Sequence, residues 1–188
     1  MGIFAAIYPS VVRVGYKLRM PLSRLTNRFR DNSGMPLKFT DYKEFAEWFK
    51  ANAKWEHDEL NGLLDNISTI GNMWAQWHQN GIMKGDCDDL ANVSSNILKD
   101  MEHQAYIVTL TPHLGFKRPG RKKKSWGHVI TVFQVDETWC VFSNTSLYDQ
   151  YFDSQEAAIL ENDFYPKDDI VLYEIRTHDL KLVRTVRV

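Results

Sequence analysis

The spacing of the hydrophobic residues changes once along this chain, near position 103, and that change limits the folds open to it. Between Tyr42 and Met101 apolar residues recur every three or four positions, which is the period of an amphipathic helix. From Ala105 onward short apolar runs alternate with turn residues, which indicates strands. Helices followed by antiparallel strands predict an α+β fold, with the helices packed on the sheet.

The same pattern sets approximate bounds for the elements. We expect helices over residues 42–49, 55–64, 70–82, 87–101 and 154–162, the first of them capped by Thr40. We expect strands over 105–110, 129–135, 139–142, 170–176 and 180–188, with a hairpin turn at 136–138. A length of 188 residues with no internal repeat indicates one domain at 37–188, preceded by a basic arm at 1–36.

The charge balance excludes some classes of partner. A net charge of -1, from 23 basic and 24 acidic residues, makes a nucleic-acid-binding protein unlikely on charge alone. The charges are nevertheless segregated: every charged residue among the first 30 is basic, and a second basic run extends from Lys117 to Lys124. Residues 149–169 are mainly acidic. Such runs are typical of solvated surface, or they form a docking surface for an acidic protein partner.

Two further features indicate the compartment. The longest apolar stretches fall short of the roughly 20 residues that a transmembrane helix requires, and Gly2 to Val12 lacks the basic flank of a signal peptide. Cys87 and Cys140 are the two cysteines, too few for a disulfide framework. We therefore expect a cytoplasmic protein without a transmembrane segment.

One block of residues carries the signs of nucleophilic chemistry. Gly85 and Asp86 precede Cys87, which begins a predicted helix. The positive end of the helix dipole favours a thiolate there, while the neighbouring aspartates raise the pKa of the thiol. Such a cysteine needs a cationic partner, and His128, at the start of a predicted strand, is the residue that can take its proton. Cys140 lies inside a strand and is expected to be structural.

A third residue is needed to orient the imidazole. Ser143 and Asn144 end the strand that follows the hairpin, and strands joined by a tight turn bring such positions within reach of His128. Asn144 can accept a hydrogen bond through its amide oxygen, so we prefer it. Ser143 is the alternative, and Asp149 is a more distant one.

Three segments of this region resemble a known superfamily. The block from Gly85 to Ala91, GDCDDLA, resembles the nucleophile motif of the transglutaminase-like cysteine proteinases, and GHVITV from Gly127 resembles their histidine strand. WCVFSN, ending at Asn144, is similar to the strand that bears their third residue, with Ser143 in place of the usual aspartate. The similarity covers residues 74–153, and the closest pattern is that of the bacterial members, with a phage-encoded member as another source.

The resemblance implies a papain-like core and a thiol hydrolase that cleaves an amide bond in a protein substrate. Cys87 would be the nucleophile, His128 the base and Asn144 the orienting residue, acting through a thioester acyl-enzyme. The alternatives are a transglutaminase or deamidase, and a catalytically impaired fold that binds a partner, which the missing aspartate favours.

Accessory groups can also be placed. The backbone N–H of Cys87 is a candidate oxyanion donor, and side chains before it could assist: Trp74, Gln76, Trp77 and Gln79. We assign no cofactor and no metal to the site. Some relatives bind calcium through acidic residues beside the nucleophile, which by resemblance would be Asp86 and Asp88, but two carboxylates alone make a weak site.

Overall fold

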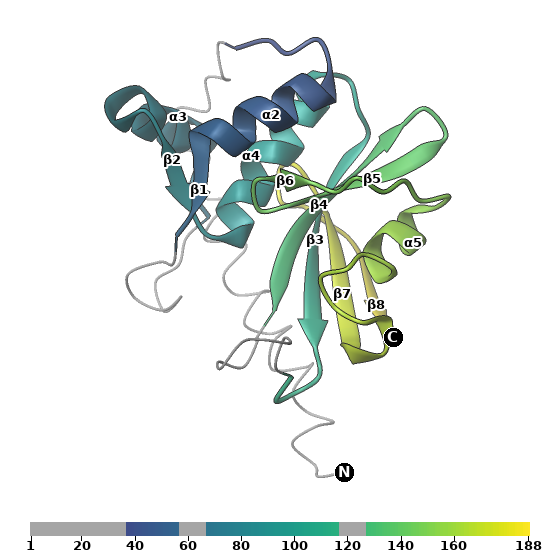
Figure 1. Cartoon of the computed structure of the whole chain (residues 1–188). Coiled ribbons are helices and arrows are strands. Elements are labelled where there is room, and N and C mark those ends of the chain that lie inside the picture. Colours follow the sequence, from purple (N-terminus) through teal and green to yellow (C-terminus); the bar gives the residue numbers. More distant parts are fainter. Residues whose placement is uncertain (1–36, 57–66, 117–126) are drawn as a thin grey trace.

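The computed structural model describes residues 37–56, 67–116 and 127–188, and within them the α+β class is confirmed (Figure 1). Six strands form one antiparallel sheet in the order β6–β5–β4–β3–β7–β8. They are β3 (Ala105–Pro112), β4 (His128–Val135), β5 (Thr138–Ser143), β6 (Ser146–Leu147), β7 (Ile170–Thr177) and β8 (Leu182–Arg187). The expected basic arm at 1–36 and the basic run from Lys117 to Lys124 lie outside the described residues.

Helices account for most of the rest of the described chain. They are α2 (Tyr42–Asn52), α3 (Ile70–Asn80), α4 (Cys87–Asp100), α5 (Gln155–Leu160) and a short 3-10 helix, η1 (Lys167–Asp169). None of the helices in the described ranges is long and apolar enough to cross a membrane.

Helices cover both faces of the sheet, and strand alternation decides which side chains meet them. Val129 and Phe133 of β4 lie in clusters with residues of α4, whereas Ile130 and Val132 lie in a cluster with α5. The face toward α4 also carries Phe142, on which Phe45 and Phe49 of α2 pack. We refer to these two sides as the α4 face and the α5 face.

Helix α4 runs in the same direction as β4. Near its start the Thr131 hydroxyl donates to the Ala91 carbonyl (3.0 Å) and contacts the Ser94 hydroxyl (2.7 Å). Near its end Leu98 lies in the cluster that contains Phe133. The three polar groups at the start are all buried, so their hydrogen bonds fix the register of the helix on the strand.

The first helix begins at Tyr42 as the pattern predicted, but its N-cap lies one residue later than expected. Asp41, not Thr40, is the N-cap of α2, and its carboxylate accepts the Lys43 N–H (3.0 Å). Thr40 instead donates to Glu44 through its hydroxyl (3.1 Å). A carboxylate caps a helix as well as a hydroxyl does, and it also gains from the helix dipole.

The helix expected over 55–64 is wrong at its first residue. Trp55 ends a short strand, β1 (Ala53–Trp55), which pairs in parallel with β2 (Met83–Gly85). The remainder of that expected helix, 57–66, lies outside the described residues. The apolar spacing of this segment indicates a helix, whereas its pairing with a strand 30 positions away leaves no periodic signal in the sequence.

The hairpin between β4 and β5 is one residue tighter than expected. Thr138 pairs with Val135, so the loop contains only Asp136 and Glu137, and Asp136 has a positive φ of 52°. A two-residue loop with a positive φ suits the twist of the flanking strands. This difference of one residue decides which side chains of β5 face the α5 side.

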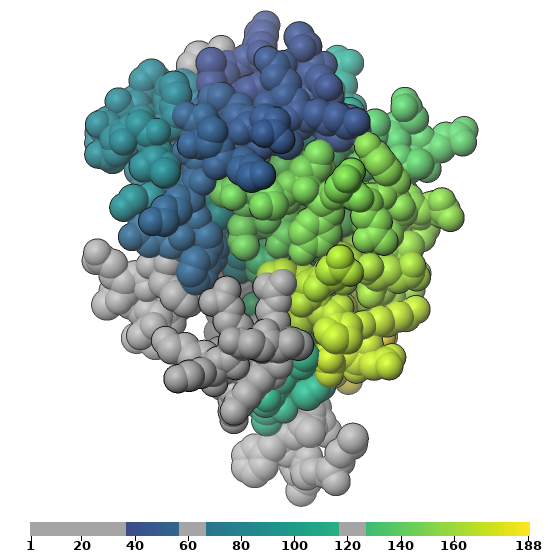
Figure 2. Space-filling view, viewed as in Figure 1, coloured from purple at the N-terminus to yellow at the C-terminus, as the bar shows by residue number. Residues whose placement is uncertain are grey.

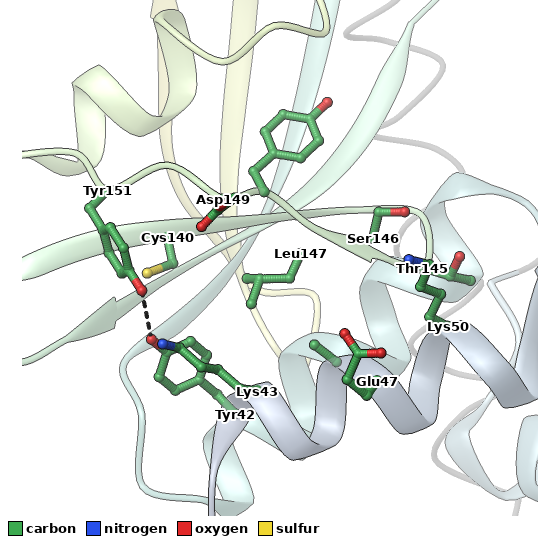
Figure 3. Close-up of a pocket in the computed structure, with 12 residues that line it drawn as sticks. Tyr42, Lys43, Glu47, Lys50, Cys140, Thr145, Ser146, Leu147, Asp149 and Tyr151 are labelled. Atoms are coloured by element: carbon green, nitrogen blue, oxygen red, sulfur yellow. Dashed lines mark hydrogen bonds between the residues drawn. The ribbon is translucent and has the colours of Figure 1, made fainter.

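The first helix and the far edge of the sheet lie against each other. Figure 2 shows α2 in blue resting on the green segment that carries β5 and β6. A cavity of about 290 Å³ opens between them, and Figure 3 shows Lys43 and Glu47 of α2 facing Ser146 and Asp149 across it. The hydroxyl groups of Tyr42 and Tyr151 meet at its end (3.2 Å).

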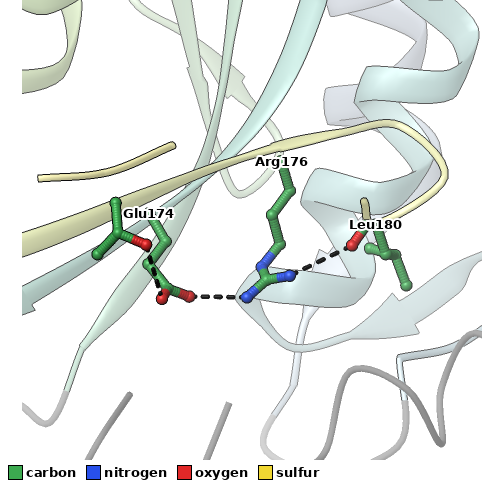
Figure 4. Close-up of polar contacts among 4 residues, drawn as sticks. Glu174, Arg176 and Leu180 are labelled. Atoms are coloured by element: carbon green, nitrogen blue, oxygen red, sulfur yellow. Dashed lines mark hydrogen bonds and ion pairs between the residues drawn. The ribbon is translucent and has the colours of Figure 1, made fainter. Parts of the chain in front are cut away.

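A buried ion pair lies along β7, the strand next to the edge strand β8, on the α4 face (Figure 4). The Arg176 guanidinium donates to the Glu174 carboxylate (2.7 Å) and to the Leu180 carbonyl (3.3 Å). Both charged side chains are at most 5% exposed. Leu180 belongs to the apolar cluster against which Cys87 packs. The ion pair therefore helps to fix the position of Leu180 under the start of α4.

Candidate active site

Cys87 is the first residue of α4, as expected. Asp86 is the N-cap, and its carboxylate accepts the Asp88 N–H (3.1 Å). The thiol is partly buried against an apolar cluster formed by Ile67, Ala91, Ile107, Val129 and Leu180. The backbone N–H of Cys87 has no acceptor within the helix, since it belongs to the first turn. It stays the oxyanion donor that the sequence predicts.

A second carboxylate ties the start of α4 to the chain before α3. The Ser68 N–H donates to Asp89 (2.6 Å), and Asn92 donates to the Ser68 carbonyl (2.9 Å). Gly85 lies against the same carboxylate, since a Cβ at this position would come within 2.6 Å of the Asp89 Cβ. The glycine before the nucleophile is therefore required by close packing.

The carboxylates at the start of α4 are close enough to share a cation. Ligand atoms of Asp86, Asp88 and Asp89 all lie within 4.8 Å of one another. Calcium prefers such hard oxygen ligands. However, Asp86 and Asp89 already accept backbone N–H groups, so their first role is to cap and anchor the helix.

His128 is the first residue of β4 and is almost fully buried, with 4% of its surface exposed. Its Nε2 lies 2.8 Å from the hydroxyl of Ser143, in hydrogen-bond contact. Its ring stacks on Phe164, with a centroid separation of 3.5 Å and an angle of 11° between the planes. The imidazole is thus held at one edge by Ser143 and across one face by Phe164.

The orienting bond is made by Ser143 and not by Asn144, which corrects the sequence-based preference. The register of the hairpin places Ile130 opposite Ser143, and His128 points to the same face as Ile130. Asn144 follows the strand with a positive φ of 53°, and its side-chain oxygen is buried without a hydrogen-bond partner. The three-residue loop expected from the sequence would have placed Asn144 opposite Ile130, whereas the two-residue loop places Ser143 there.

Cys87 and His128 lie at the same end of the sheet. Cys87 precedes Ala91 by four helical residues, about 6 Å along the axis. His128 precedes Thr131 by three strand residues, about 10 Å. Since Thr131 and Ala91 are hydrogen-bonded and the two elements run in the same direction, both side chains lie beyond that contact. The thiol lies on the α4 face, whereas alternation directs the imidazole toward the α5 face.

The predicted oxyanion side chains have other partners. The side-chain amide oxygen of Gln76 accepts the backbone N–H of Lys84 (3.0 Å). The indole N–H of Trp77 donates to the side-chain oxygen of Asn52 (2.7 Å). Trp74 stacks on Trp77 at 4.8 Å, and Gln79 is exposed. Gln76 and Trp77 thus join α3 to β2 and α2.

The second cysteine has the properties of a structural residue. Cys140 is 1% exposed, and burial raises the pKa of its thiol to about 11, with Lys43 opposing the shift. It lines the cavity between α2 and the β5–β6 segment, away from His128, because Cys140 faces the α4 side of its strand.

Two residues of this region escaped the sequence-based predictions. Phe164 lies beyond the stretch that resembles the superfamily. Arg176 lies in a segment whose pattern of apolar residues indicates a strand and nothing about a site. Neither has a local motif, so no signal in the sequence could have assigned them.

No protein-family model matches the chain, and no curated protein matches it. The function is therefore inferred from the residues and their geometry.

Proposed function

We propose that this protein is a thiol hydrolase of the transglutaminase-like, papain-like kind, acting on an amide bond in a protein substrate. The observation that carries the proposal is the His128–Ser143 hydrogen bond, formed at the end of the sheet where α4 begins with Cys87. A nucleophile at a helix N-terminus, a base and a group that orients the base are the three components of such a site.

In the proposed reaction His128 takes the Cys87 proton, and the thiolate attacks the substrate carbonyl. The Cys87 N–H binds the oxyanion. Collapse breaks the carbon–nitrogen bond, and the imidazolium returns the proton to the leaving amine, which leaves a thioester. His128 then activates a water molecule, and hydrolysis of the thioester restores the thiol. An amine in place of water would give transglutamination, and a glutamine side chain as the substrate would give deamidation.

The proposal sets a geometric requirement. With Nε2 hydrogen-bonded to Ser143, the proposal requires Nδ1 to exchange the proton with Cys87. The thiol and the imidazole have to meet around the first residue of β4, where the strand no longer separates the two faces. Ser143 provides orientation without the charge of an aspartate, so it stabilises the imidazolium less than a carboxylate would.

The second candidate is a protein-binding module that keeps the fold and has lost the reaction. Two observations favour it: the neutral hydroxyl at position 143, and the projection of Cys87 and His128 from opposite faces. In this proposal the basic run of the sequence from Lys117 to Lys124 would select an acidic partner.

The pH dependence of Cys87 alkylation separates the two candidates. We expect Cys87 to react with iodoacetamide with an apparent pKa well below the free-thiol value of about 8.5, measured in Cys140→Ala to remove the second thiol. His128→Ala should restore the ordinary value, and Ser143→Ala should restore part of it. Asn144→Ala is the matched control and should have no effect. An ordinary thiol in all of these proteins would reject the hydrolase and leave the binding module.

A further inference from the structure

Phe164 covers the imidazole on which the proposed reaction depends. The two rings are nearly parallel, and their centroids are 3.5 Å apart. Phe164 follows α5 by four residues, in a segment that crosses the α5 face of the sheet and contacts its core. A phenyl ring in this position excludes water from one face of the imidazole and restricts its rotation.

The chain around Phe164 is itself fixed. The buried side chain of Asn162 donates to the Ala158 and Ile159 carbonyls (3.2 and 2.7 Å) and accepts the Phe164 N–H (3.0 Å). One amide therefore caps the end of α5 and sets the backbone of Phe164 at the same time. The position of the ring is determined by these bonds as well as by contact with His128.

Two more aromatic residues extend the cluster to which Phe164 belongs. Tyr165 is 1% exposed and packs edge-on against Phe164 (4.8 Å, 83°). Phe116, which follows β3, packs edge-on against Tyr165 (5.2 Å, 77°). Edge-on aromatic pairs are specific in geometry and add about 0.5–1.5 kcal/mol beyond burial.

We infer that Phe164 is a positioning residue for His128: it holds the imidazole plane so that Nε2 stays on Ser143 and a single tautomer is populated. Its consequence for catalysis rests on the proposed function. The restraint itself does not, since it concerns only the imidazole. Leu110 and Ser143 flank His128 on the neighbouring strands, and the charged side chains nearest Phe164 in the chain, Glu161 and Asp163, are exposed. The phenyl ring, and not a charge from this segment, is therefore the restraining group.

The test combines two measurements on the full chain. Two-bond proton–nitrogen NMR of histidine-labelled protein reports the tautomer of His128, and Cys87 alkylation at pH 6 reports its reactivity. We expect the wild type to show the Nε2–H tautomer, with Phe164→Leu giving an average of both. Phe164→Leu should also lower the alkylation rate about threefold to tenfold, which is the range for loss of one aromatic pair. Phe164→Tyr should keep both properties.

A matched control separates positioning from general loss of packing. Phe116→Leu removes a ring of the same group that contacts Tyr165 and not His128, so it should change stability but neither readout. If Phe164→Leu leaves the His128 tautomer unchanged, the inference is wrong. If the tautomer changes while the pH dependence of alkylation does not, Phe164 positions the imidazole and the proposed Cys87–His128 reaction is the part that fails.

Discussion

Replacing Ser143 by aspartate tests directly how the imidazole is held. Ser143 is 6% exposed and its hydroxyl lies 2.8 Å from His128 Nε2. An aspartate here would put a carboxylate within hydrogen-bond distance of a buried imidazole. Ser143→Asn is the matched control, since asparagine has the size and shape of aspartate without its charge.

The expected magnitude follows from the charge. A carboxylate in contact with a titratable group of opposite charge shifts its pKa by about 1–3 units. For His128 the shift is upward, because the carboxylate favours the imidazolium. One pKa unit corresponds to about 1.4 kcal/mol, so the pair should add about 1–4 kcal/mol when His128 is protonated.

The sign determines the pH window. A folded-state pKa above the unfolded value of about 6.5 means that the folded protein binds the proton more tightly. The added stability is therefore present in full below about pH 6.5, and it is lost as the pH rises through the range between that value and the raised folded pKa. Above that range the buried carboxylate faces a neutral ring, and Ser143→Asp should be less stable than Ser143→Asn.

Urea unfolding between pH 5.5 and 9.5, followed by tryptophan fluorescence, measures this difference. The stability of Ser143→Asp minus that of Ser143→Asn should fall by about 1–4 kcal/mol across the range. Two parallel curves would refute the reasoning, because they would mean that position 143 does not contact the imidazole. The same comparison should be repeated with His128→Gln in both proteins. If the difference in stability then no longer falls with pH, the titrating group is His128.

Three further predictions concern the framework around the site. Gly85→Ala should lower the free energy of unfolding by about 1–3 kcal/mol, because its Cβ would lie 2.6 Å from the Asp89 Cβ; urea melts measure this loss, and its absence would contradict the packing. Glu174→Gln should cost about 3–5 kcal/mol, since it leaves the buried Arg176 guanidinium without its carboxylate; Arg176→Met in the same chain should return part of this in thermal melts, and a loss below 1 kcal/mol would show that water reaches the pair. Cys140 should be alkylated at pH 8 far more slowly in the folded protein than in urea, because burial raises its pKa to about 11; the same shift predicts that stability falls between about pH 9 and 11, and equal labelling by mass spectrometry would contradict both.

Much of the framework could be predicted because it depends on local patterns. The pattern of apolar residues located α4 from Cys87 and five of the six strands of the sheet to within two residues, and it missed the short strand β6. The helix N-terminus at Cys87 followed from a glycine, a capping aspartate and an apolar period, all of which lie next to one another. The pairing of β1 with β2 could not be predicted, since it joins segments that share no pattern. Phe164 was missed for the same reason, because its contact with His128 spans 36 positions and depends on how the segment after α5 crosses the sheet.

The length of the hairpin loop decides which residue of β5 contacts His128. Side chains on neighbouring strands share a face only in alternate positions, so the length of the hairpin loop decides whether Ser143 or Asn144 accompanies His128. Asp136 with a positive φ closes the loop in two residues, and counting from Val135 opposite Thr138 then leads to Ser143. An aspartyl residue that accepts a positive φ was visible in the sequence, so the tighter turn could have been predicted from it.

The same counting bears on whether the site is active. Side chains alternate between the two faces along β4. His128 therefore lies on the face where Ser143 and Phe164 contact it, and its ring points away from the face that carries Cys87. A thiolate–imidazolium pair would need the ring to reach around the strand end, while Ser143 contributes no charge to stabilise it. The proposed enzyme therefore depends on a weaker ion pair than a carboxylate would support. For this reason Ser143→Asp is expected to raise the Cys87 alkylation rate at pH 6 if the two groups communicate, whereas an unchanged rate together with the predicted shift in stability would show that His128 titrates without activating the thiol.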